Sequence, residues 1–140
     1  MNDSIKKEHV FQHPIDKVWD AISIEKEISS WFIKADFKAE KGYYYTFNSE
    51  GEHCTQINGV IVEADPYTLI YTWIVEGTKA ETTVKWTLEE VEEGTKLYLE
   101  HSGISEYEGD TAVDMFNSFN NGWNNCINKL TEYLKAVYAG

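Results

Sequence analysis

The sequence of 140 residues lacks long hydrophobic runs and is poor in basic residues. No apolar stretch approaches the roughly 18 residues needed to span a bilayer, and the segment from Met1 to Glu8 is polar, so we expect a soluble, unexported, cytoplasmic protein. Twelve Lys and Arg residues stand against 24 Asp and Glu residues, which gives a formal net charge of -12. Nucleic acids and anionic membrane surfaces would repel this chain, so neutral or basic partners are expected.

Cysteine is scarce as well, with only Cys54 and Cys126 in the chain. Isolated cysteines in an unexported protein are usually small buried hydrophobic side chains, an interpretation that we favour over a disulfide. The sequence has no internal repeat, low-complexity tract or linker rich in Pro and Ser, and its length suits one compact domain. We predict a single domain over residues 1–140.

Signatures of metal and nucleotide chemistry are missing too. There is no glycine-rich phosphate loop and no Gly-x-Ser-x-Gly elbow, so nucleotide use and elbow-type acyl transfer have no support. His9 and His13 are four residues apart on or beside a strand, a separation of about 13 Å that is too large for a shared metal ion. His53 and Cys54 would point to opposite faces of a strand. We predict no metal and no cofactor.

The sequence does contain amphipathic segments in a definite order. Residues 4–12 are typical of a strand, which His13-Pro14 ends because proline is tolerated at the first position of a helix. Two short helices are then predicted from apolar residues at helical spacing. Their apolar positions are Ile15, Val18, Trp19 and Ile22 in the first helix, and Ile24, Ile28 and Trp31 in the second.

From Lys34 onward the sequence indicates about six antiparallel strands separated by turn residues. The clearest strands cover residues 43–47, 55–64, 69–75, 82–91 and 96–103. Alternation places two sets of side chains inside, namely Val84, Trp86 and Leu88, then Leu97, Leu99 and His101. Residues 55–64 and 69–75 are apolar on both faces, so alternation does not settle which of their side chains point inward.

The last segment is a predicted amphipathic helix of about 27 residues that begins near Asp110, where Thr111 to Asp114 fit a capping box. Gly122 inside it costs about 1 kcal/mol relative to alanine, which we interpret as a packing requirement or a kink beside Trp123. Only the β-hairpins can cover its apolar stripe, so we predict an α+β fold in which a curved antiparallel sheet wraps around the helix. The stripe is Phe116, Phe119, Trp123, Ile127, Leu130 and Leu134.

Aromatic residues make up 14% of the chain and include five tryptophans, many of them where sheet and helix should meet. Core packing accounts for some of these rings, and the others suit a ligand cavity, which is mostly apolar with a few polar groups. The candidate polar groups are Tyr71, Gln56, His101 and Asn120. The predicted lining residues are Tyr71, Trp73, Val84, Trp86, Leu88, Leu97, Leu99, His101, Phe116, Phe119, Asn120, Trp123 and Ile127.

His101 and Glu63 are the candidates for a general acid or base, because each lies in an otherwise apolar strand where burial shifts a pKa. The alternative for Glu63 is a position at the strand edge that caps the next turn, and the alternative for His101 is a satisfied structural hydrogen-bonding role. We favour both alternatives and assign no catalytic residue. The segment from Ser102 to Gly109 is a candidate gate to the cavity.

Several short motifs run through the chain in a fixed order. They are Pro14 with Val18-Trp19-Asp20-Ala21, Glu27-Ile28-Ser29-Ser30-Trp31-Phe32, Gly59-Val60-Ile61-Val62-Glu63, Asp65-Pro66, Leu69 to Trp73, Thr83 to Leu88, Gly94-Thr95-Lys96-Leu97 and Gly122-Trp123. The order of elements is similar to the helix-grip fold of the START-like (SRPBCC, Bet v 1-like) superfamily. The motifs resemble the activator of Hsp90 ATPase homologue 1-like family, over about Ile5 to Leu134.

This resemblance implies a hydrophobic cavity between the sheet and the C-terminal helix. It implies a carrier or sensor of a small hydrophobic molecule, such as a lipid, polyketide or flavonoid-like aromatic compound, with a role in the stress response. A cyclase or dehydratase on the same fold and a co-chaperone-like module are the alternatives, since one fold hosts many functions. The eukaryotic activator works mainly through a separate N-terminal domain, which we expect to be absent here, so a chaperone partner ranks last.

Overall fold

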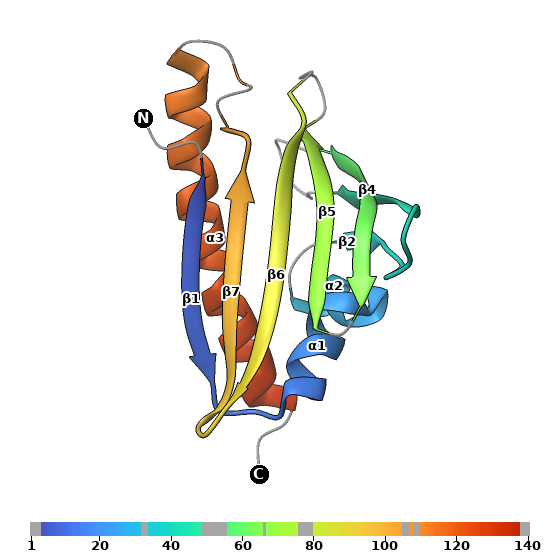
Figure 1. Ribbon diagram of the computed structural model, residues 1–140, viewed down its shortest axis with the longest axis vertical. Coiled ribbons are helices and arrows are strands. Elements are labelled where there is room, and N and C mark those ends of the chain that lie inside the picture. Colours follow the sequence, from blue (N-terminus) through green and yellow to red (C-terminus); the bar gives the residue numbers. More distant parts are fainter. Residues whose placement is uncertain are drawn as a thin grey trace.

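The computed structural model describes residues 4–31, 34–48, 56–65, 67–75, 80–104, 107 and 110–137. The elements follow the predicted order of one strand, two helices, six strands and a long helix (Figure 1). Their bounds are β1 (Ile5–Phe11), α1 (Ile15–Ser23), α2 (Glu25–Trp31), β2 (Lys34–Asp36), β3 (Tyr44–Asn48), β4 (Gln56–Asp65), β5 (Thr68–Val75), β6 (Thr82–Val91), β7 (Gly94–Ser102) and α3 (Asp110–Val137).

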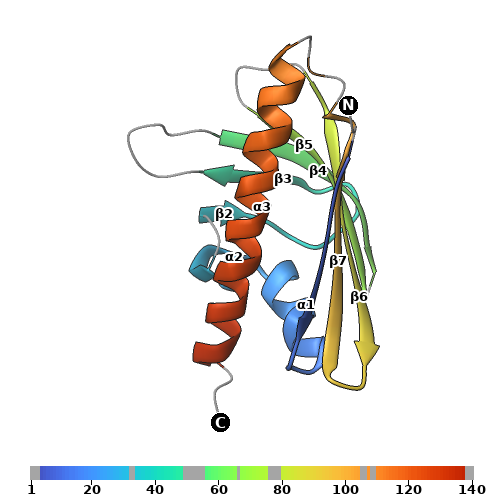
Figure 2. The same cartoon turned by 90° about the vertical axis from the view of Figure 1, so that its left-hand side faces the viewer.

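The strands form one antiparallel sheet in the order β1-β7-β6-β5-β4-β3-β2. Helix α3 lies along the concave face of this curved sheet, and α1 and α2 cover the same face near the C-terminal end of α3 (Figure 2). The arrangement confirms the predicted α+β helix-grip fold. None of the helices within the described residues is both long and apolar enough to cross a membrane.

The two short helices bury most of the expected stripes, with Trp19 half-buried and Ile24 exposed. Ile15, Val18 and Ile22 of α1 are buried, as are Ile28 and Trp31 of α2. The prediction for Ile24 is wrong, because this residue lies between the helices, forms a β-bridge with Lys38 and is 43% exposed.

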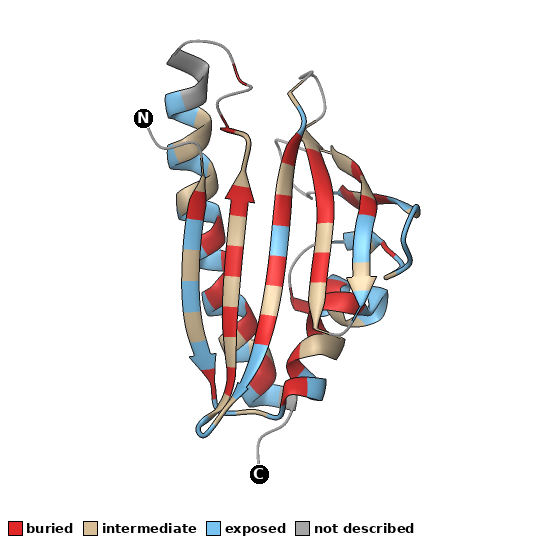
Figure 3. Ribbon diagram, in the orientation of Figure 1, coloured by how far each residue is buried: buried red, intermediate tan, exposed pale blue. Residues whose placement is uncertain are grey.

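The alternation in β6 and β7 is confirmed by burial along both strands (Figure 3). Val84, Trp86 and Leu88 are buried on the inner face of β6, and β7 buries Leu97, Leu99 and His101. Because the two strands pair in register, Val84 lies opposite His101 and Trp86 opposite Leu99. The inner faces of β6 and β7 thus form one continuous surface toward α3.

A register shift in β4 explains why alternation does not resolve this part of the sheet. The pairing with β5 is displaced by one residue between Ile61 and Glu63, so a bulge interrupts the strand. Ile61 lies opposite Tyr71 before the shift, and Ala64 lies opposite Leu69 after it. Side chains on one face therefore change sequence parity within β4. In β5 the inner set is Leu69, Tyr71 and Trp73.

Helix α3 has the predicted length and bounds. Gly122 is exposed on it, and a Cβ added there would meet nothing within 4 Å, so no packing requirement for this glycine is found in the described residues. The predicted capping box falls on the side chain of Thr111, which lies outside the described part of the structure. From Trp123 to Leu134 every residue of the predicted stripe is buried.

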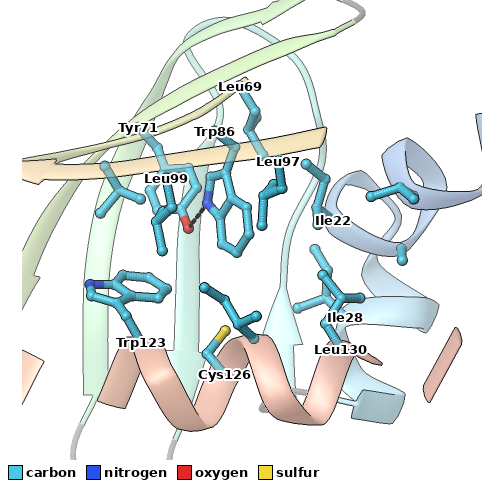
Figure 4. Close-up of a cluster of buried hydrophobic side chains, with 14 of the residues drawn as sticks. Ile22, Ile28, Leu69, Tyr71, Trp86, Leu97, Leu99, Trp123, Cys126 and Leu130 are labelled. Carbon is cyan, nitrogen blue, oxygen red and sulfur yellow. Dashed lines mark hydrogen bonds between the residues drawn. The ribbon is translucent and has the colours of Figure 1, made fainter. Parts of the chain in front are cut away.

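Aromatic side chains bridge the space between α3 and the sheet (Figure 4). Trp86 from β6 and Trp123 from α3 meet edge to face with ring centroids 5.8 Å apart. The indole N–H of Trp86 donates to the Tyr71 hydroxyl at 2.9 Å, so this buried donor has its partner within the core. Farther along α3, Cys126 and Leu130 are also buried, and Leu130 lies toward Ile28 of α2.

Candidate functional site

A second group of rings lies nearer the start of α3, which we call the aromatic cluster and define as Phe47, Trp73, His101, Phe119 and Trp123. Trp73 of β5 is its centre. Its ring lies 5.3 Å from Trp123, 5.5 Å from His101, 6.1 Å from Phe119 and 6.2 Å from Phe47, measured between centroids. The cluster therefore draws on three strands and the helix, and it sits where β3, β5, β7 and α3 converge.

Burial changes along α3 where the helix crosses this cluster. Trp123 is buried, whereas Phe119 and Phe116, the two preceding members of the same stripe, are half-buried. Phe119 contacts buried rings on its inner side, since its centroid is 4.7 Å from His101 and 6.1 Å from Tyr107. The aromatic surface thus runs from the closed core to the protein surface within two turns of helix.

His101 is fully buried and uses both ring nitrogens in hydrogen bonds. The Trp123 indole N–H donates to Nδ1 at 2.9 Å, so Nδ1 is unprotonated. The Thr82 hydroxyl donates to the Trp73 carbonyl at 3.1 Å and therefore accepts the proton of Nε2, which is 2.6 Å away. The contacts assign the neutral Nε2–H tautomer to His101.

Titratable groups near the cluster are held in their neutral forms by burial. Burial lowers the pKa of His101 from its ordinary value of 6.5 to about 4. Burial also raises the pKa of the Tyr71 hydroxyl and of the Cys126 thiol far above their usual ranges. At neutral pH these three groups therefore carry no charge.

One polar atom of the cluster has no partner. Trp73 is only 5% exposed, and its buried Nε1–H forms no hydrogen bond with any described residue. Buried side-chain donors in native proteins almost always have a partner, whether protein, water or ligand. The donor lies among rings rather than beside a protein acceptor.

The sequence pattern that defines the family described as "Activator of Hsp90 ATPase homolog 1-like protein" matches residues 12–135. The chain belongs to this family. The match covers most of α1 through α3, and it confirms the resemblance drawn from the sequence motifs. A search of the curated proteins found no match.

Solved structures of the same fold cover nearly all of this member of the family. Protein MLL2253 from Mesorhizobium loti is 25% identical with a TM-score of 0.84, and the alignment covers 95% of this chain and 97% of that one. Protein BH1534 from Bacillus halodurans is 28% identical with a TM-score of 0.75 and coverages of 93% and 95%. DynU16, a protein from the dynemicin biosynthetic locus, is 20% identical with a TM-score of 0.81. The alignment covers 96% of this family member and 48% of DynU16.

The predicted lining residues divide into two sets in this family member. One set belongs to the closed core, where the side chains pack on one another and Tyr71 accepts from Trp86. It comprises Tyr71, Val84, Trp86, Leu88, Leu97, Leu99 and Ile127. The other set lies in or beside the aromatic cluster and comprises Trp73, His101, Phe116, Phe119, Asn120 and Trp123. Asn120 is half-buried on α3 next to Phe119.

Two candidate polar residues lie away from the cluster. Gln56 donates to the Asn58 side chain at 2.8 Å, and strand alternation places both on the face opposite to Ile57. Glu63 is exposed and faces a surface hollow of about 530 Å³ rather than the interior. The β4 bulge causes this, because it shifts the alternation immediately before Glu63. The exposed position agrees with the favoured interpretation of Glu63 as a residue at the strand edge, not as a buried acid or base.

Other predicted features fall outside the described residues. His53 and Cys54 belong to this group, as does half of the candidate gate from Ser102 to Gly109. Within that gate Ser102, Gly103, Ile104 and Tyr107 are described, and Ile104 and Tyr107 are buried. Cys126 is a buried free thiol, as predicted. Among the described residues no three His, Cys, Asp or Glu side chains come close enough to hold a metal ion.

Sequence reasoning missed two members of the site. Phe47 contacts Trp73, and Thr82 completes the His101 network. Alternation does not single out Phe47, because the strand of residues 43–47 carries aromatic residues on both faces. Thr82 becomes recognisable only from the register that places it opposite Trp73.

Proposed function

We propose that this protein binds a small hydrophobic, aromatic molecule between the sheet and the first half of α3, as a carrier or sensor. The observation that carries the proposal is the course of the aromatic surface along α3, from the buried Trp123 to the half-buried Phe119 and Phe116. Ligand sites are concave, mostly apolar and reachable from solvent. A flat ring inserted beside Phe119 would meet rings on its inner side.

The neutral state of the interior supports binding over catalysis. His101 was the candidate acid or base, and both of its nitrogens are committed to Trp123 and Thr82. Its lowered pKa also leaves it uncharged at neutral pH. The cyclase-type and co-chaperone-type alternatives gain no comparable observation among the described residues.

The test is a titration of the full chain with fluorene, flavone and oleic acid as probes, in which the backbone amide chemical shifts are measured by NMR at each step. We expect saturable shifts for the aromatic probes, confined to β5, β7 and residues 115–123. Phe119→Ala should weaken binding of the aromatic probes about tenfold, because a ring that contacts the ligand is lost.

The matched control is Tyr133→Ala, which removes another half-buried ring from α3 at its opposite end, where Tyr133 donates to Glu27. This variant should bind the probes as the parent does. Equal weakening in both variants would indicate a general loss of stability instead of a local site. Absence of saturable shifts with every probe would contradict the proposal.

A further inference from the structure

Trp73 differs from the other buried tryptophans in what its N–H does. Trp31 donates to the Ala21 carbonyl at 2.7 Å, Trp86 to the Tyr71 hydroxyl at 2.9 Å and Trp123 to His101 at 2.9 Å. The Trp73 N–H alone among these four has no partner in the described structure. A donor removed from water without a compensating bond costs free energy, so such groups are rare in native proteins.

The acceptors around Trp73 are already occupied. His101 Nδ1 accepts from Trp123, and the backbone carbonyl of Trp73 accepts from Thr82. The remaining ring neighbours, Phe47 and Phe119, carry no polar side-chain atom. A molecule that enters the cluster can supply the acceptor that these neighbours do not offer.

The same surroundings restrict the charge of that acceptor. The four rings that contact Trp73 are uncharged, since His101 is held neutral by its buried network. A buried carboxylate or phosphate without a cationic partner would cost several kcal/mol. An uncharged oxygen, such as a ketone or quinone carbonyl, needs no counter-ion and requires one donor.

We propose that the ligand is a flat, uncharged aromatic compound whose carbonyl oxygen accepts the hydrogen bond of Trp73 Nε1–H. This inference rests on the proposed function and specifies the class of molecule for the same site. The rings of the cluster hold the aromatic body, and Trp73 fixes its orientation. An alkyl chain or an aromatic hydrocarbon has no oxygen that could accept the Trp73 hydrogen bond.

The test compares 9-fluorenone with fluorene, two probes that share a three-ring skeleton and differ in having C=O or CH₂ at one position. We expect the ketone to bind the full chain about three to ten times more tightly, the worth of one net hydrogen bond. Its carbonyl makes the ketone the less hydrophobic probe, so apolar transfer cannot produce this preference. The indole ¹H–¹⁵N resonance of Trp73 should shift on addition of the ketone, and that of Trp86 should not.

The matching variant is Trp73→Phe, which keeps a ring and removes the donor. In this variant the two probes should bind with about equal affinity. The smaller ring weakens both probes alike, so its effect cancels in the ratio of their dissociation constants. Trp86→Phe is the control, since it removes an indole whose N–H is already bonded to Tyr71. This control should keep the preference of the parent.

Each result separates the two proposals. If both probes bind equally and the Trp73 resonance does not move, the inference is overturned while the proposed function stands, and the N–H is then directed at a ring face or at water. If neither probe binds, the proposed function falls and the inference with it. Should Trp73→Phe fail to fold, the indole resonance and the probe ratio of the unsubstituted chain still decide.

Discussion

At the scale of single residues, His101 shows how a group suited to acid–base chemistry becomes structural. The sequence placed it on the inner face of its strand, which is confirmed by its complete burial. Its role depends on Trp123 and Thr82, which lie 22 and 19 residues away in the chain. Alternation can identify the face, but it cannot identify partners on other elements.

The buried histidine makes stability depend on pH. In the folded protein the pKa of His101 is about 4, below its ordinary value of 6.5, so between these values the unfolded chain binds more protons. The free energy of unfolding therefore falls as pH decreases from 6.5 to 4, by roughly 3 kcal/mol from this group at the acid end. Urea unfolding of the parent and of His101→Gln at pH 7 and pH 4.5 measures this loss.

Glutamine is the chosen replacement because its amide can accept from Trp123 and donate to Thr82 without titrating. The carboxylates titrate in both proteins, so their contribution cancels in the comparison. We expect His101→Gln to lose less stability than the parent over this pH range. Equal losses in the two proteins would show that His101 is not held neutral in the folded state.

At the scale of elements, the sequence predicted the order of strands and helices and most of their bounds. Period-two alternation in β6 and β7 and the long apolar stripe of α3 carried this success. It failed locally at Ile24, which bridges to Lys38, and it left the facing of residues 55–64 open, where the β4 bulge reverses the alternation. Both outcomes depend on backbone pairing with another segment, which a local pattern does not encode.

Replacement by alanine should have opposite effects on stability at Gly59 and at Gly122. A Cβ at Gly59 would lie 2.1 Å from the Thr72 carbonyl oxygen and 2.7 Å from the Tyr45 ring, which crosses over this glycine as its hydroxyl donates to the same carbonyl. Gly59→Ala should therefore destabilise by about 3 kcal/mol or more. Gly122→Ala should stabilise by about 0.5–1 kcal/mol, because α3 has open space there.

Thermal and urea unfolding of the two variants measure both effects. Each variant is the other's control, since the chemical change is identical and only the surroundings differ. A neutral effect at Gly59 would mean that Tyr45 and β5 can move apart at little cost. A destabilising effect at Gly122 would restore the packing role that the sequence suggested for it.

At the scale of the whole molecule, the aromatic content and the acidic charge act in different places. The rings fill the concave side of the sheet, and the charge lies on the outside, where the ion pairs Lys38–Glu40 and Lys96–Glu8 are largely exposed. The candidate site could be predicted as an aromatic region between sheet and helix. Its division into a closed core and a half-exposed cluster could not, because that depends on how closely α3 approaches each strand.

A net charge of -12 predicts that salt stabilises the folded chain. Like charges repel more strongly in the compact state, and raising NaCl from about 10 mM to about 150 mM shortens the screening length from about 30 Å to about 8 Å. We expect the free energy of unfolding to increase over this range.

Glu92 and Glu93 are both exposed at the β6–β7 turn and contribute to the repulsion. The double variant Glu92→Gln with Glu93→Gln should therefore raise stability at low salt and reduce the salt dependence of stability. The control is Glu40→Gln, which removes an acid that already has Lys38 at 3.5 Å and should gain less. Stability that falls as NaCl is added, or equal gains in the control and the double variant, would contradict the view that unpaired surface acids limit the stability of this fold.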